Sequence, residues 1–201
     1  MDIMVKDIVG PVLQDEEIKE CIETSLGLLN SMTDREDLHA RSCLERFNNI
    51  VMGEIAEQTV IKWFRSRGKY AESAVNKKSG RPDEGYDIIL HGRDGNDVTC
   101  SVKSSISVYK NKMEDILETF HLASKRSEIR QVNIQVYFWL NPNGYPRVCT
   151  PSNTNVAIIG WAGNKELLTK LEKHYPRENR RVIEMPLKEL SPMESLLNWI
   201  T

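Results

Sequence analysis

A hairpin with a charge at each of its open ends constrains this chain more than any other segment. Residues 86–91 (YDIILH) and 97–103 (DVTCSVK) are apolar runs on either side of the turn signal GRDGN, which predicts two antiparallel strands. Asp87 stands near the start of the first run, and Lys103 ends the second. The hairpin therefore returns both charges to the end of the sheet that lies away from the turn.

Side-chain alternation assigns the residues of the second strand to two faces. Val98, Cys100 and Val102 are apolar and are expected to face the core. Ser101 and Lys103 then lie together on the opposite face. The second strand therefore has one apolar face and one polar face.

The length of the loop decides which residue lies opposite Asp87. A two-residue turn would direct its carboxylate, unpaired, toward the core, which costs several kcal/mol. A three-residue loop pairs Asp87 with Ser101 when it is centred on Asp94, or with Lys103 when it is centred on Gly95. We predict an odd-length loop that clusters the three polar groups about 5 Å apart. A cross-strand ion pair with a purely structural role, worth about 0.2–1 kcal/mol, is the alternative.

Composition narrows the class of protein. The chain has 201 residues, 40% of them hydrophobic and 28% charged, which is typical of a soluble globular domain. A net charge of −2 means that any DNA binding must use a local basic surface. Four scattered cysteines without a C-x-x-C pair argue against a zinc cluster or a secreted disulfide scaffold and favour a cytoplasmic protein. No leader segment is expected, and no apolar run approaches the ~18 residues of a membrane span.

Periodicity and turn signals predict a single α/β domain over residues 1–201, with a mixed sheet flanked by helices. We expect an N-terminal helical extension (1–44), a core (45–162) and a C-terminal helix-strand-helix segment (163–201). Helices are predicted at 12–30, 33–68, 112–126, 164–175 and 191–200. The other predicted strands are 69–75, 131–140, 156–162 and 181–185.

The hairpin motif resembles that of a known nuclease superfamily. Pro82-Asp83 and Gly85-Tyr86-Asp87, followed by Ser101-Val102-Lys103, are similar to the motif of the PD-(D/E)XK superfamily, which includes many restriction endonucleases. The order of helix, three-stranded meander, helix and strand over residues 45–160 also resembles that family's core. The resemblance implies a Mg²⁺-dependent endonuclease that hydrolyses phosphodiester bonds in DNA, of restriction or phage-defence type. RNA is an alternative substrate.

The resemblance assigns roles to individual residues. Asp87 would bind the metal, with Asp83 as the alternative, and the main-chain carbonyl of Val102 would be a further ligand. Lys103 would be the motif's lysine, which holds the attacking water and offsets charge on the phosphate. The position two before this lysine should be acidic but is Ser101, which can only hydrogen-bond a metal-bound water. One aspartate supplies too little negative charge for Mg²⁺.

The missing acid is expected from a helix. Glu54 ranks first because it lies on an apolar stripe of its helix, with Glu57 as its neighbour. Glu118 ranks next, with Glu114, on the helix that follows Lys103. A glutamate at the edge of the stripe with its carboxylate in water is the alternative for Glu54.

Two polar segments near the motif are candidates for DNA contacts. Lys77, Lys78 and Arg81 lie in the basic loop 76–82, and Ser104 and Lys110 lie in residues 104–112. Cleavage of both strands needs two sites, so a homodimer is expected. The main alternative is a catalytically inactive nuclease-fold module that binds DNA or protein.

Overall fold

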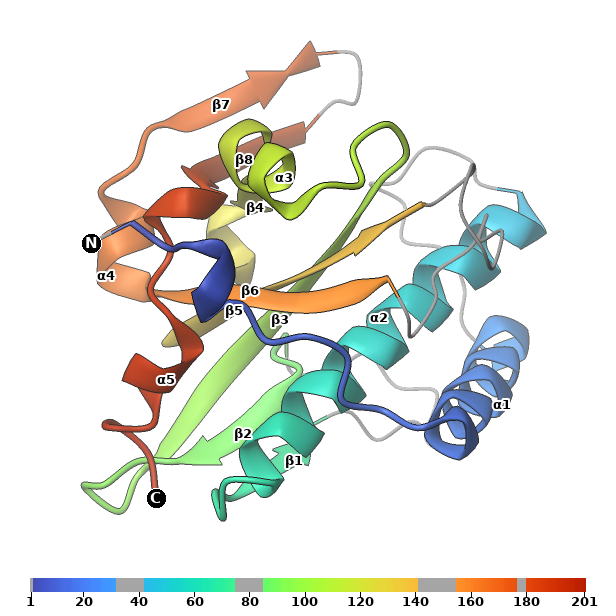
Figure 1. The fold of residues 1–201 in the computed structure, drawn as a ribbon, viewed down its shortest axis with the longest axis horizontal. Helices are drawn as coiled ribbons and strands as arrows, with labels where there is room; N and C mark the ends of the chain where they lie inside the picture. The colour runs from blue at the N-terminus through green and yellow to red at the C-terminus, as the bar shows by residue number, and fades with distance from the viewer. Residues whose placement is uncertain (1, 32–41, 75–84, 141–154, 177–179) are drawn as a thin grey trace.

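A mixed five-stranded sheet organises the protein, in the strand order β1-β2-β3-β5-β6 (Figure 1). Its strands are β1 (Ala71–Ser73), β2 (Ile88–His91), β3 (Asp97–Ser107), β5 (Val132–Trp139) and β6 (Val156–Gly163). β3 and β5 run parallel, whereas the other neighbours are antiparallel. The computed structural model describes residues 2–31, 42–74, 85–140, 155–176 and 180–201. The predicted α/β class with a mixed sheet flanked by helices is confirmed.

The β2–β3 hairpin has the predicted odd-length loop. The N–H of Gly92 donates to the carbonyl of Asn96 at 2.8 Å, which closes a three-residue loop centred on Asp94. Continued along the two strands, this register places Asp87 opposite Ser101, which is one of the two predicted pairings. The polar residues of β3 therefore lie on the predicted face.

Helix α2 (Cys43–Arg65) crosses one face of this sheet (Figure 1). It begins after Ser42, whose hydroxyl accepts a hydrogen bond from the N–H of Glu45 at 3.2 Å. The start predicted at residue 33 falls outside the described residues. The predicted stop is confirmed, because Gly68 adopts the left-handed backbone (φ 68°) three residues after the helix.

A second helix covers the outer side of α2, and from Val51 to Phe64 most residues of α2 are buried. α1 (Asp15–Ser31) packs along it, and Lys62 of α2 forms an ion pair with Glu17 of α1. This burial explains why the sequence of α2 shows apolar residues around its whole circumference. The helix can therefore carry an acidic residue toward the sheet without exposing it to bulk water.

A second, three-stranded antiparallel sheet was not predicted. It consists of β4 (His121–Ser124), β8 (Arg180–Pro186) and β7 (Glu172–Tyr175), in that order. The helices predicted at 112–126 and 164–175 were therefore wrong in their second halves. Within these two segments, the α-helices are α3 (Met113–Thr119) and α4 (Asn164–Leu168). The other short helical elements that the structure describes are α5 (Met193–Leu196) and the 3₁₀ turns η1 (Val5–Asp7), η2 (Arg126–Glu128) and η4 (Leu187–Glu189).

Strand pairing overrides local helical periodicity at these positions. Leu122 is fully buried opposite Met185, so the segment gains more from edge pairing than from continuing α3. The terminal helix predicted at 191–200 is also too long, because the end of the chain pairs with the hairpin. The N–H of Thr201 donates to the carbonyl of His91 at 2.8 Å.

Two hydrophobic cores cover the two faces of the five-stranded sheet. The first packs α2 against the face that carries Cys100 and Ile134. The second joins Tyr137 and Ile159 of the opposite face to the three-stranded sheet and α3. Among the described residues, no helix combines the length and the apolar character needed to cross a membrane.

Replacing Glu17 with glutamine should destabilise the α1–α2 contact slightly. Burial tends to raise the pKa of Glu17, but hydrogen bonds from Lys62 and from the N–H of Gln14 outweigh it and lower this pKa overall. A lowered folded-state pKa contributes stability above the unfolded pKa, and this contribution is lost as the pH falls through the folded value. Both side chains of the pair are about one-third exposed, so we expect a loss below about 1 kcal/mol at pH 7 and none at pH 3.

Urea unfolding of the unaltered protein and of Glu17→Gln at pH 7 and pH 3 measures the difference in the free energy of unfolding. Glu23→Gln is the matched control, since Glu23 meets Lys19 only at 4.0 Å on an exposed face. A difference that persists at pH 3 would contradict the ion-pair explanation.

Candidate functional site

The carboxylate of Asp87, immediately before the first residue of β2, accepts hydrogen bonds from β3. Its Oδ2 accepts the main-chain N–H of Val102 at 2.6 Å and the hydroxyl of Ser101 at 3.3 Å. The N–H of Asp87 still donates to the carbonyl of Cys100 at 2.9 Å, but for the next donor of β3 the side chain acts in place of a main-chain carbonyl. The predicted contact between Asp87 and Ser101 is therefore present, and the carboxylate is held in one orientation.

Lys103 is held by a residue that the sequence did not indicate. Its Nζ lies 2.8 Å from Oε2 of Glu128, and the two side chains are 23% and 27% exposed. Glu128 ends the turn η2, on a segment that lies 25 residues further along the chain. No local pattern marks this glutamate, because only the folding of the segment before β5 brings it to Lys103.

The two residues of helix α2 predicted as candidates for the second acid, Glu54 and Glu57, are both buried. They are 7% and 8% exposed, and Glu54 accepts a hydrogen bond from Gln58 at 3.2 Å. Burial raises the pKa of the Cys100 thiol well above its usual value, and the negative charges of Asp87 and Glu57 raise it further. Glu57 therefore acts on the same point of the sheet as Asp87. This makes it a strong candidate for the second acid, and Glu54 stays a prediction.

β3 continues past the level at which β2 begins, and its side chains alternate between the two faces of the sheet there. Cys100 faces α2, whereas Ser101 and Lys103 lie on the face opposite α2. Figure 1 shows β3 extending well past the short β2. Asp87 lies immediately before β2, next to the main chain of Val102.

The other candidate acids lie on the exposed surface of α3. Glu114 is exposed, and Glu118 forms an ion pair with Lys188 at 2.9 Å. α3 packs against β8 and η4 of the second layer. Their solvent exposure leaves α2 as the better source of a second acid.

The residues predicted to contact DNA fall into two groups. Outside the described residues lie Lys77, Lys78, Arg81 and the alternative metal ligand Asp83. Ser104 is half-buried within β3, which continues to Ser107, so residues 104–107 are strand rather than the expected polar loop. The N–H of Lys110 donates to the hydroxyl of Ser107 at 2.9 Å, which fixes the turn after the strand.

Arg130 is a cation beside the candidate site that the sequence did not indicate. Its guanidinium lies against Gly85, two residues before Asp87, where an added Cβ would stand 2.4 Å from Nη2. Gly85 also adopts a positive φ of 82°, which favours glycine. Nη1 donates to the carbonyls of Ser127 and Ile129 at 2.7 and 2.9 Å, so the side chain is held in this place.

The donor atoms at this site suit a hard cation. Within the described ranges, no three histidine, cysteine or acidic side chains gather as metal ligands. Mg²⁺ in proteins commonly uses one or two carboxylates and completes its shell with water and phosphate oxygens. The carboxylates of Asp87 and Glu57, whose charges both act on Cys100, are oxygen donors of this kind. Their donor type suits Mg²⁺, and the magnesium site stays a proposal.

Comparisons with known proteins provide no relative of this chain. No protein-family model, no curated protein and no solved structure matches it. The grounds for a functional proposal are therefore the geometry of the site and the resemblance of its motif.

Cys100 should react with a thiol-labelling reagent much more slowly than Cys43. The thiolate is the reactive form, and burial with the two nearby negative charges keeps Cys100 protonated, whereas Cys43 is exposed at the start of α2. We expect iodoacetamide at pH 8 to modify Cys43 in the native protein and Cys100 only after unfolding. Peptide mass spectrometry gives both rates, and native labelling of Cys100 as fast as Cys43 would contradict this site.

Replacing Asp87 with alanine should destabilise the fold, because two donors of β3 lose their acceptor. We expect a loss of about 1–3 kcal/mol in the free energy of unfolding, measured by urea denaturation. Asp87→Asn keeps an acceptor oxygen and should lose less. Equal stability of Asp87→Ala and the unaltered protein would show that water replaces the carboxylate without cost.

Proposed function

We propose that this protein is a Mg²⁺-dependent endonuclease with a restriction endonuclease-like core, acting on phosphodiester bonds in DNA. The observation that carries the proposal is the carboxylate of Asp87, which the N–H of Val102 fixes immediately before β2. Lys103 lies two residues beyond Ser101 on the same strand face, and the charge of Glu57 reaches the same region from α2. An acid pair beside an ammonium is the combination that phosphodiester hydrolysis requires.

Asp87, Glu57 or Glu54, and the carbonyl of Val102 would hold the metal. When bound, Mg²⁺ supplies Lewis-acid chemistry and a more acidic water. The protein contributes the orientation of the donors. Ser101 donates to Asp87 at 3.3 Å, so its role here is to fix the carboxylate rather than to replace the missing acid.

Two cations would face the scissile phosphate. Glu128 holds the Lys103 ammonium at 2.8 Å in a partly buried setting, where its charge offsets negative charge more strongly than in water. Arg130 lies beside Gly85 at the entrance to β2 and would bind a phosphate oxygen. The chain thereby positions the phosphate against the Asp87 carboxylate.

The partners of the proposed enzyme follow from the reaction. Of the residues predicted to contact DNA, the cations Lys77, Lys78, Arg81 and Lys110 would bind the DNA backbone, whereas Ser104 lies half-buried within β3. A homodimer in the cytoplasm would place two sites on the two strands, as a restriction or phage-defence enzyme requires.

A second candidate function is an inactive nuclease-fold module that binds DNA or a protein. The neutral Ser101 at the acidic position of the motif and the engagement of Lys103 by Glu128 favour it. Such a module binds without Mg²⁺. The dependence of cleavage on the metal therefore separates the two candidates.

A plasmid cleavage assay tests the proposal. We expect nicking or linearisation with Mg²⁺ and none with EDTA. Asp87→Asn and Lys103→Ala should each lose at least about 100-fold in rate, because each removes a charge from the reacting centre. Lys170→Ala is the matched control, since Lys170 is also a partly buried lysine in an ion pair, with Glu189 at 2.5 Å.

The outcomes distinguish the candidates. Equal cleavage by the unaltered protein and both variants would exclude this site. DNA binding that falls with salt, persists in EDTA and is never followed by cleavage would establish the binding module. Glu57→Gln and Glu54→Gln, compared side by side, identify which acid of α2 contributes.

A further inference from the structure

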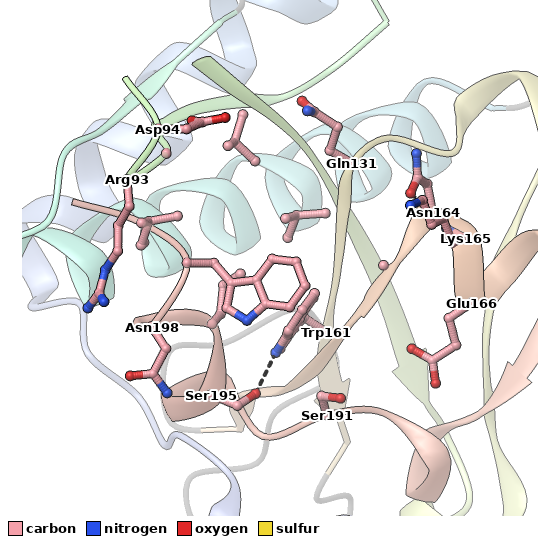
Figure 2. A pocket seen from close by; sticks show the side chains of 17 residues that line it. Arg93, Asp94, Gln131, Trp161, Asn164, Lys165, Glu166, Ser191, Ser195 and Asn198 are labelled. Atoms are coloured by element: carbon pink, nitrogen blue, oxygen red, sulfur yellow. Dashed lines mark hydrogen bonds between the residues drawn. The ribbon is translucent and has the colours of Figure 1, made fainter. Parts of the chain in front are cut away.

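A pocket of about 1010 Å³ lies at the other end of the β2–β3 hairpin, beside its turn (Figure 2). The hairpin loop, the start of β5, the end of β6 and the C-terminal residues form its walls. Arg93 donates its N–H to the carbonyl of Trp199 at 3.1 Å, so the loop and the C-terminus are joined across this pocket. Its size is that of a site for a small ligand.

Two tryptophans give the pocket an aromatic floor. Trp161 is 8% exposed, and its indole N–H donates to the hydroxyl of Ser195 at 3.0 Å and the carbonyl of Pro192 at 3.2 Å, which fixes the ring (Figure 2). Trp199 meets it edge-to-face at 5.9 Å and 70° but is itself 67% exposed. Trp161 is fixed but buried, so the exposed indole of Trp199, which packs against it, is the stacking surface for a planar ring.

The polar rim offers hydrogen-bond donors to a ligand. The amide oxygen of Gln131 accepts the N–H of Thr99 at 2.8 Å, and that of Asn164 accepts the N–H of Lys165 at 2.7 Å. Among the described residues, the amide NH₂ groups are then the part of these side chains left for a ligand. Figure 2 shows Arg93 and Lys165 on opposite sides of Trp161.

The rim also carries two acids, Asp94 and Glu166, beside the cations Arg93 and Lys165. The carboxylate of Asp94 accepts the N–H and the amide of Asn96 at 3.1 and 2.9 Å, which holds it within the loop. Glu166 is exposed on α4. The ligand that fits is therefore planar and aromatic and rich in acceptors for the amide groups of the rim.

We propose that this pocket binds a nucleotide, whose base stacks on Trp199 while its phosphate meets Lys165 or Arg93. A free mononucleotide or an unpaired base of a DNA strand supplies this chemistry. The second source rests on the proposed nuclease function. The six residues from Asp87 to Gly92 span about 17 Å, a distance that several nucleotides of one strand can bridge.

Anisotropy of a fluorescein-labelled oligothymidylate, measured in EDTA, tests the pocket. Trp199→Ala should weaken binding about tenfold, because stacking on an aromatic side chain carries affinity in such sites. Trp199→Phe keeps an aromatic face and should retain most of it. Leu171→Ala is the control, since Leu171 is a large apolar side chain that is 86% exposed outside this pocket.

Competition identifies the source of the base. Displacement by thymidine monophosphate establishes a mononucleotide site, whereas displacement only by unlabelled oligonucleotide establishes a strand site. Lys165→Gln should weaken the phosphate-bearing competitors and leave thymidine unchanged. Equal binding by Trp199→Ala and the unaltered protein overturns the proposal. Binding is measured in EDTA, where no cleavage takes place, so a failure of the nuclease proposal leaves this result intact.

Discussion

The pairing of β3 is the constraint on which the rest of the structure depends. This 11-residue strand pairs antiparallel with β2 over its first part and parallel with β5 over most of its length. Because β2 is short, the N–H of Val102 is left without a main-chain partner from β2, and the carboxylate of Asp87 supplies one. The unpaired N–H of β3 thereby fixes the charged side chain of Asp87 immediately before β2.

The charges around this point are stabilised in pairs or by hydrogen bonds, as partial burial demands. Lys103 has Glu128, and Glu54 accepts from Gln58. Removing one partner of such a pair costs more than the pair itself contributes, because it leaves a poorly solvated charge. The charged side chains are therefore held in fixed positions, which is the property that a preorganised electrostatic site needs.

The hairpin also connects two sites of different chemistry. Its open end carries carboxylate and ammonium groups suited to a phosphodiester, and its turn borders an aromatic pocket suited to a base. The C-terminal residues hold the turn through main-chain hydrogen bonds to His91 and Arg93. A rigid β-ribbon between the two sites would keep their separation constant, so a single strand of nucleic acid would contact both in one register.

The sequence by itself determined the hairpin, its loop of odd length and the shared face of Ser101 and Lys103. Turn chemistry and two-residue alternation are local properties, so neighbouring residues suffice to predict them. Only the tertiary structure decided that Glu128 holds Lys103, that residues 121–124 pair with a strand near the C-terminus, and that Trp161 and Trp199 form a pocket. These contacts join residues far apart in the chain, and the free energy that selects them comes from burial and strand pairing, which no local pattern records.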